Sequence, residues 1–156
     1  MNAPEKECCC RSLDDLAIVP MGGDGLDEQV FASLDRVCDY GGDLWWLYLS
    51  RCSACGQNWA VAQEERIHDN YCLKRLGPVE ARAAIEQNLW PEEFLTFEDV
   101  LKLERASGKI ALFFDRLSPA LADTAKELRE ARPEITIEEI ADVLAIEPAT
   151  VRLFLS

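Results

Sequence analysis

Cys52-Ser53-Ala54-Cys55-Gly56 is followed by His68 and Cys72, which gives the spacing Cys-x2-Cys-x12-His-x3-Cys. Thiolate and imidazole groups bind Zn²⁺ well, and this ligand set with this spacing is a recurring structural zinc pattern. Four protein ligands close the coordination shell and leave no position for water or substrate. The sequence therefore predicts one structural Zn²⁺ held by Cys52, Cys55, His68 and Cys72, which stabilises the fold and takes no part in a reaction.

The residues around these ligands predict a compact unit over 43–76. Its first part is dense in aromatic and apolar side chains, as in a strand that is buried on both faces. Its last part predicts a helix, on which His68 and Cys72 share one face about 6 Å apart. The expected elements are a strand, a tight knuckle, a second strand and a helix, over 43–51, 52–55, 57–63 and 64–76.

Residues 52–72 resemble a zinc finger or zinc knuckle of the type whose ligands are three cysteines and one histidine, with Trp59 at the position of that family's core aromatic residue. Glu65 stands where the family has an apolar residue, so we expect the unit to pack on the rest of the chain. Two alternatives remain open. The knuckle could use other ligands, or the two knuckle cysteines could be small buried hydrophobic residues beside a solvated His68.

We expect a single domain over residues 1–156, because this length suits one hydrophobic core and no linker interrupts the sequence. Residues 1–12 predict a flexible tail. The tail contains Cys8-Cys9-Cys10, which could bind metal but which we expect to be incidental. Residues 78–156 predict a helical part. The expected fold class is α+β and mainly α, with a short β-hairpin and its zinc knuckle packed on the helices.

The last helical pair opens at a capping box formed by Thr136 and Glu139. Residues 136–155 resemble a helix-turn-helix, with Ala145 in place of the usual turn glycine. That family places its second helix in the major groove of DNA. Here the second helix offers Arg152 among mostly apolar residues, so we expect the pair to serve packing or protein contact.

The net charge of −13 is unevenly distributed along the chain. Residues 1–50 carry 10 acidic and 3 basic side chains, residues 51–76 carry 3 and 4, and residues 77–156 carry 16 and 9. Such a surface repels phosphate backbones and attracts basic proteins. We therefore expect a basic protein partner and no nucleic acid.

No apolar run approaches the roughly 18 residues that a membrane helix needs, and the first residues lack the apolar stretch of a signal peptide. We therefore expect no contact with a membrane. A reducing cytoplasm is the expected location, where the seven cysteines stay thiols or bind metal.

In its overall character, which is small, acidic and without a catalytic motif, the chain resembles immunity proteins of bacterial toxin systems. Their nuclease toxins are often basic. The resemblance implies a non-catalytic, antitoxin-type inhibitor that neutralises a basic toxin by direct binding. The candidate contact residues for this toxin combine acidic side chains with an aromatic one: Glu92, Glu93, Phe94, Glu98 and Asp99. The other interpretation of these residues is a solvated helix face.

Two other functions remain open. One is a helix-turn-helix transcriptional regulator with a structural zinc, whose DNA binding would weaken steeply as salt rises. The other is a thiol- or zinc-dependent enzyme with His68 as base. Such an enzyme needs a third orienting group and an electropositive pocket, and the sequence specifies neither.

Overall fold

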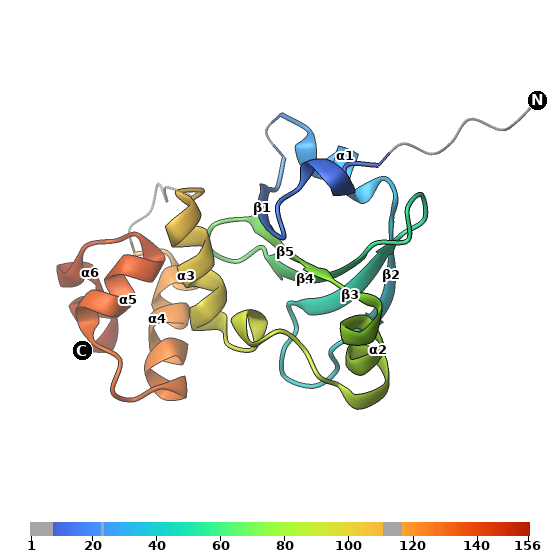
Figure 1. Cartoon of the computed structure of the whole chain (residues 1–156). Helices are drawn as coiled ribbons and strands as arrows, with labels where there is room; N and C mark the ends of the chain where they lie inside the picture. Colours follow the sequence, from blue (N-terminus) through green and yellow to red (C-terminus); the bar gives the residue numbers. More distant parts are fainter. Residues whose placement is uncertain (1–7, 23, 111–116) are drawn as a thin grey trace, which may run out of the picture.

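The structure is a computed structural model that describes residues 8–22, 24–110 and 117–156. The described chain begins with a mixed region of strands and short helices and ends with four helices (Figure 1). The elements in chain order are η1 (Cys10–Ser12), β1 (Leu16–Pro20), α1 (Leu26–Phe31), β2 (Leu34–Asp39), β3 (Leu47–Cys52), β4 (Asn58–Glu64), β5 (Asn70–Leu76), α2 (Pro78–Gln87), η2 (Glu92–Phe94), α3 (Phe97–Ser107), α4 (Pro119–Ala131), α5 (Ile137–Leu144) and α6 (Pro148–Leu155).

The strands form one antiparallel sheet in the order β1-β5-β4-β3-β2. Strands β2 to β5 follow one another as a meander, and β1 closes the sheet at its other edge. The β1–β5 register runs from Leu16 opposite Lys74 to Pro20 opposite Asn70. The predicted α+β class is confirmed, but the β part is a five-stranded sheet and not the short hairpin that the sequence predicted.

Residues 64–76 do not form the predicted helix, because Asn70–Leu76 is strand β5. The preceding residues form a loop that ends at Asp69, whose φ of 56° lies in the left-handed region. The carboxylate of Glu64 holds this loop by accepting hydrogen bonds of 2.6 to 2.8 Å from three backbone N–H groups, those of Arg66, Ile67 and His68. The predicted strand–strand–helix unit is therefore wrong at its third element.

The two faces of the sheet bury different sets of side chains, because side chains alternate along each strand. The N-terminal segment and α1 lie over one face, while α2 and η2 lie over the other (Figure 1). The first face contributes Tyr48, Cys52, Trp59, Val61 and Leu73 to its core. The second contributes Leu47, Leu49, Ala60, Ala62, Cys72 and Leu76.

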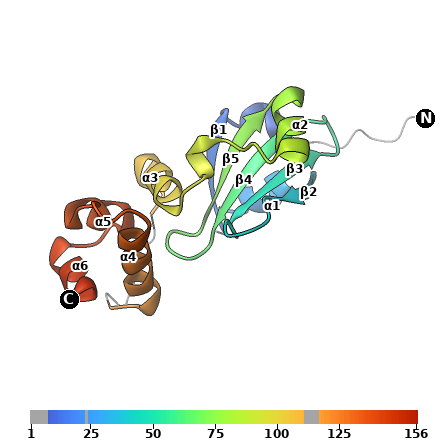
Figure 2. The ribbon, with the colours of Figure 1, turned by 90° about the horizontal axis from the view of Figure 1, so that it is seen from below.

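Helices α3 to α6 enclose a further apolar core beside the sheet (Figure 2). Helix α3 packs on both parts, since Val100 belongs to the sheet core and Leu101 to the helical core. Across the same junction Arg66 binds Glu127 through two hydrogen bonds, of 2.7 and 3.1 Å. No helix among the described residues is long and apolar enough to cross a membrane.

Candidate metal centre

Four cysteines from two distant parts of the chain meet at one end of the sheet. Cys8 and Cys10 come from the N-terminal segment, Cys52 ends β3, and Cys55 lies in the turn before β4. Their Sγ atoms all lie within 4.8 Å of one another. Cys10 and Cys52 are buried, Cys8 is half-buried and Cys55 is exposed. The cluster is therefore a possible metal site with one open side.

The β3–β4 turn is built to present Cys52 and Cys55 together. The Cys52 N–H donates to the carbonyl of Gln57 at 2.9 Å, and the Gly56 N–H donates to the carbonyl of Cys52 at 2.8 Å. Gly56 has a φ of 79°, which a residue with a side chain adopts only at a cost. These contacts close a tight turn, called the knuckle below, whose two sulfurs lie within 4.8 Å of each other.

Contacts with other protein groups hold Cys10 and the backbone that follows it in place. The Arg75 guanidinium donates to the carbonyls of Cys10 and Leu13 at 2.6 and 2.8 Å. It also lies 4.4 Å from the centre of the Trp59 ring, which is the geometry of a cation–π contact. The Trp59 indole N–H in turn donates to the Cys10 Sγ at 3.4 Å. Residues of β4 and β5 therefore place Cys10 against the knuckle.

The thiols differ in acidity. Burial alone would raise the pKa of Cys52, but its hydrogen bond with the Ser33 hydroxyl and those with the backbone of Cys55 and Ala54 lower it to about 6. Burial raises the pKa of Cys10 to about 12, although the Trp59 indole opposes this shift, and burial also raises the pKa of Cys55. Cys52 is thus the most acidic of these three thiols, and a bound cation would favour ionisation of all of them.

The donor set fits a tetrahedral thiophilic metal ion. Four sulfurs at the usual Zn–S distance of about 2.3 Å lie about 3.8 Å apart, which agrees with sulfurs that all lie within 4.8 Å of one another. Four thiolates would fill the coordination shell and leave no exchangeable position. The site suits a structural ion better than a catalytic one.

Two of the four predicted ligands are in this cluster and two are elsewhere. Cys52 and Cys55 belong to it, whereas Cys72 lies on β5 and is fully buried in the core of the opposite sheet face. Burial strongly raises the pKa of the Cys72 thiol. The His68 Nε2 lies 2.9 Å from the carbonyl oxygen of Val143 on α5. The structure therefore does not bring His68 and Cys72 to the knuckle, since the predicted helix that would present them is a loop and a strand.

Cys8 and Cys10 are the candidate ligands that the sequence interpretation set aside as incidental. Within the predicted flexible tail over 1–12, Cys8, Cys9 and Cys10 pack against the core of one sheet face, while residues 1–7 lie outside the described part of the chain. The only signal was a second pair of closely spaced thiols, and the single residue between Cys8 and Cys10 is fewer than the usual two to four of a zinc pair.

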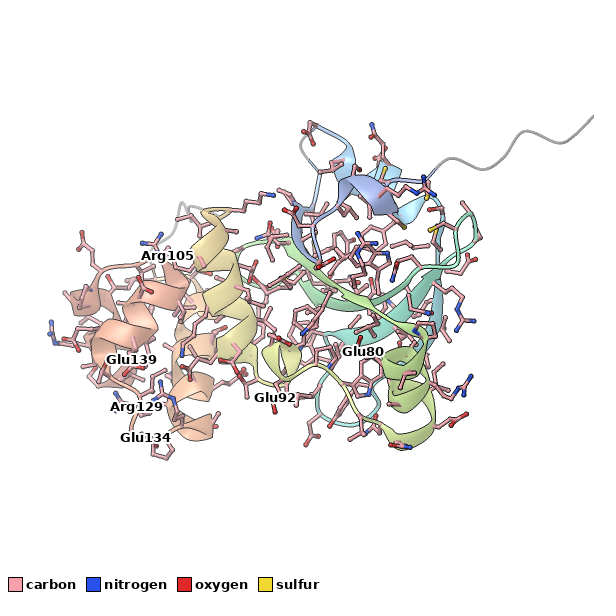
Figure 3. The ribbon with its side chains drawn as sticks, in the orientation of Figure 1. Glu80, Glu92, Arg105, Arg129, Glu134 and Glu139 are labelled. Atoms are coloured by element: carbon pink, nitrogen blue, oxygen red, sulfur yellow. The ribbon has the colours of Figure 1, made fainter. Side chains whose placement is uncertain are left out.

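The predicted partner-binding residues differ widely in accessibility. Phe94 is fully buried and cannot serve as an exposed anchor. The Glu98 carboxylate is engaged by Arg132 at 2.9 and 3.0 Å and by Lys102 at 2.9 Å. Glu93 pairs with Lys74 at 2.7 Å and is half-buried, as is Asp99, whereas Glu92 is exposed on η2 (Figure 3).

A buried pair of carboxyl groups lies between the sheet and α3. Glu64 and Glu104 are both fully buried. The Asn70 side-chain amide donates to the Glu104 carboxyl at 2.7 Å. Burial and the neighbouring Glu64 raise the pKa of Glu104 to about 10. Glu104 is therefore protonated at neutral pH, while Glu64 accepts the three backbone N–H groups of its loop.

Comparison with known proteins adds no relative: no protein-family model, no curated protein and no solved structure matches this chain.

Proposed function

We propose that this chain is a non-catalytic, acidic protein-binding module whose fold is stabilised by a structural Zn²⁺ bound to Cys8, Cys10, Cys52 and Cys55. The observation that carries the metal is the approach of four thiol sulfurs to within 4.8 Å of one another. Zinc is the natural ion for such a set, because four-cysteine tetrahedral sites are its common structural form. The ion would tie the N-terminal segment to the β3–β4 knuckle.

Charge supports the protein-binding role. The chain carries 29 acidic and 16 basic residues, and carboxylates occur on α2, η2, the loop after α4, and α5, as Glu80, Glu92, Glu134 and Glu139 illustrate (Figure 3). The negative electrostatic field of such a surface raises the rate of association with a basic protein and repels nucleic acid. An immunity-type or antitoxin-type inhibitor of a basic, nuclease-like toxin has this character.

Zinc analysis of single variants tests the metal. The purified wild-type protein is expected to hold about one equivalent of zinc, and Cys8→Ser, Cys10→Ser, Cys52→Ser and Cys55→Ser are each expected to lose it and to melt earlier. Cys38→Ser and Cys72→Ala are the controls, because neither residue belongs to the cluster. Retention of zinc by Cys8→Ser together with its loss from Cys72→Ala would contradict the assignment.

Partner capture from the native host tests the function. The expected result is co-purification of a basic protein whose complex dissociates as salt rises, with inhibition of that protein's activity by the purified chain. Recovery of specific duplex DNA would instead support the regulator alternative, in which α5 and α6 act as the helix-turn-helix that residues 136–155 resemble. Arg152 is the only basic residue on α6, and it lies 3.8 Å from Glu138, which disfavours that alternative.

A further inference from the structure

An open groove lies between the β2–β3 turn, the start of α3 and the C-terminal end of α4. Its volume is about 760 Å³. Elements from both parts of the molecule contribute to it, so it exists only in the assembled fold. The lining residues that matter below are Asp43, Trp45, Phe97, Asp99 and Glu134.

Trp45 gives the groove an exposed aromatic surface. All four tryptophans lie in the described part of the chain, and Trp45 is 53% exposed whereas the other three are buried. Its ring lies 5.5 Å from that of Trp46 and 5.7 Å from that of Phe97, measured between ring centres. Trp46 is itself fixed, because its indole N–H donates to the carbonyl of Phe94 at 2.8 Å. The exposed ring is therefore held by a rigid aromatic support.

The charged groups around this ring leave an excess of negative charge. The groove is lined by five carboxylates and two cationic side chains, Lys102 and Arg132. Both cations are already bound to Glu98, and the Glu127 carboxylate is bound to Arg66. Asp43, Asp99 and Glu134 have no ion-pair partner among the residues that the structure describes.

We propose that this groove binds a basic polypeptide segment of the partner, with an arginine side chain stacked on Trp45 and neighbouring cationic groups at Asp43, Asp99 and Glu134. The inference rests on the proposed protein-binding function and assigns its contact surface. A guanidinium is planar, stacks on indole and binds carboxylates through a fixed set of donors. An exposed tryptophan among unpaired carboxylates offers both interactions at once.

The test uses a blocked ten-residue peptide of alternating arginine and glycine as the probe, with a glutamine-for-arginine peptide as its neutral counterpart. Binding to the zinc-loaded protein is measured at low salt by calorimetry, which reads every variant alike. Trp45→Ala and the triple variant Asp43→Asn/Asp99→Asn/Glu134→Gln are each expected to weaken binding about tenfold.

The matched control Asp35→Asn/Glu86→Gln/Glu147→Gln removes the same charge from exposed positions outside the groove and is expected to change binding less than about threefold. Thermal melting confirms that each variant is folded.

Three results would overturn the assignment of the groove. The wild-type protein could fail to bind the arginine peptide, the glutamine peptide could bind as tightly, or the groove and control triple variants could lose the same affinity. In the last case binding depends on diffuse charge, so the groove is wrong while an acidic protein-binding function stands. Failure to recover a basic partner from the host would instead count against the function itself.

Discussion

At the scale of single residues, the four-cysteine cluster shows how far a motif can be interpreted without the fold. Cys52 and Cys55 could be predicted, because a Cys-x2-Cys turn with a following glycine presents two sulfurs locally. His68 and Cys72 could not be excluded from the sequence, since a four-residue separation suits one face of a helix. The strand that places Cys72 in the opposite core is fixed by pairing with β1 and β4, which a local pattern does not contain.

Glu104 offers a prediction at the same scale. Its pKa is raised from 4.5 to about 10 in the folded protein, first by burial and then by Glu64. Between about pH 4.5 and pH 10, the folded chain therefore holds a proton on Glu104 that the unfolded chain has already released. Because the folded state binds more protons in this window, the free energy of unfolding falls as pH rises through it.

Glu104→Gln is expected to remove that dependence, because the amide resembles the neutral acid in shape. At pH 8 the variant should melt a few degrees above the wild type, by roughly 2–4 °C for each kcal/mol gained. At pH 4 the two should melt alike, and Glu86→Gln, which changes an exposed carboxylate and keeps Glu104, should show the same pH dependence as the wild type. Melting curves across pH check this, and a difference in stability between the two proteins that stays constant from pH 4 to pH 8 would contradict a raised pKa of Glu104.

At the scale of elements, the sequence predicted best where the stabilising contacts are local. The capping box at the start of α5 is present, since Thr136 Oγ1 accepts from the Glu139 N–H at 3.0 Å and Glu139 Oε1 accepts from the Thr136 N–H at 3.3 Å. The predicted helix over 64–76 failed because Glu64 instead satisfies three backbone N–H groups of a loop. A buried carboxylate in that role leaves no clear periodic signal.

The turn between α5 and α6 carries a testable strain. Ala145 ends α5 with a φ of 57°, in the left-handed region that favours glycine. Ala145→Gly is therefore expected to stabilise the protein by about 1 kcal/mol, as measured by chemical denaturation. The matched control is Ala122→Gly in the body of α4, which should cost about 1 kcal/mol. If both substitutions destabilise equally, Ala145 is not strained.

At the scale of the whole molecule, the four-cysteine cluster, a candidate metal centre, is a product of long-range topology. Strand β1 pairs with β5, and Arg75 on β5 binds the carbonyls of Cys10 and Leu13 ahead of β1. This pairing brings Cys8 and Cys10 to a knuckle that lies more than 40 residues further along the chain. The composition predicts a basic partner. The sequence could not predict that the N-terminal segment would meet the knuckle, because no local pattern specifies which strand edge such a segment will join.

The most direct test of the account is X-ray absorption spectroscopy of the protein loaded with one equivalent of Zn²⁺. The account predicts four sulfur neighbours at about 2.3 Å and no imidazole, as Cys8, Cys10, Cys52 and Cys55 would supply. A spectrum with three sulfurs and one nitrogen at about 2.0–2.1 Å would instead indicate ligation by a histidine. Since His68 is the only histidine in the chain, that result would contradict the four-cysteine centre.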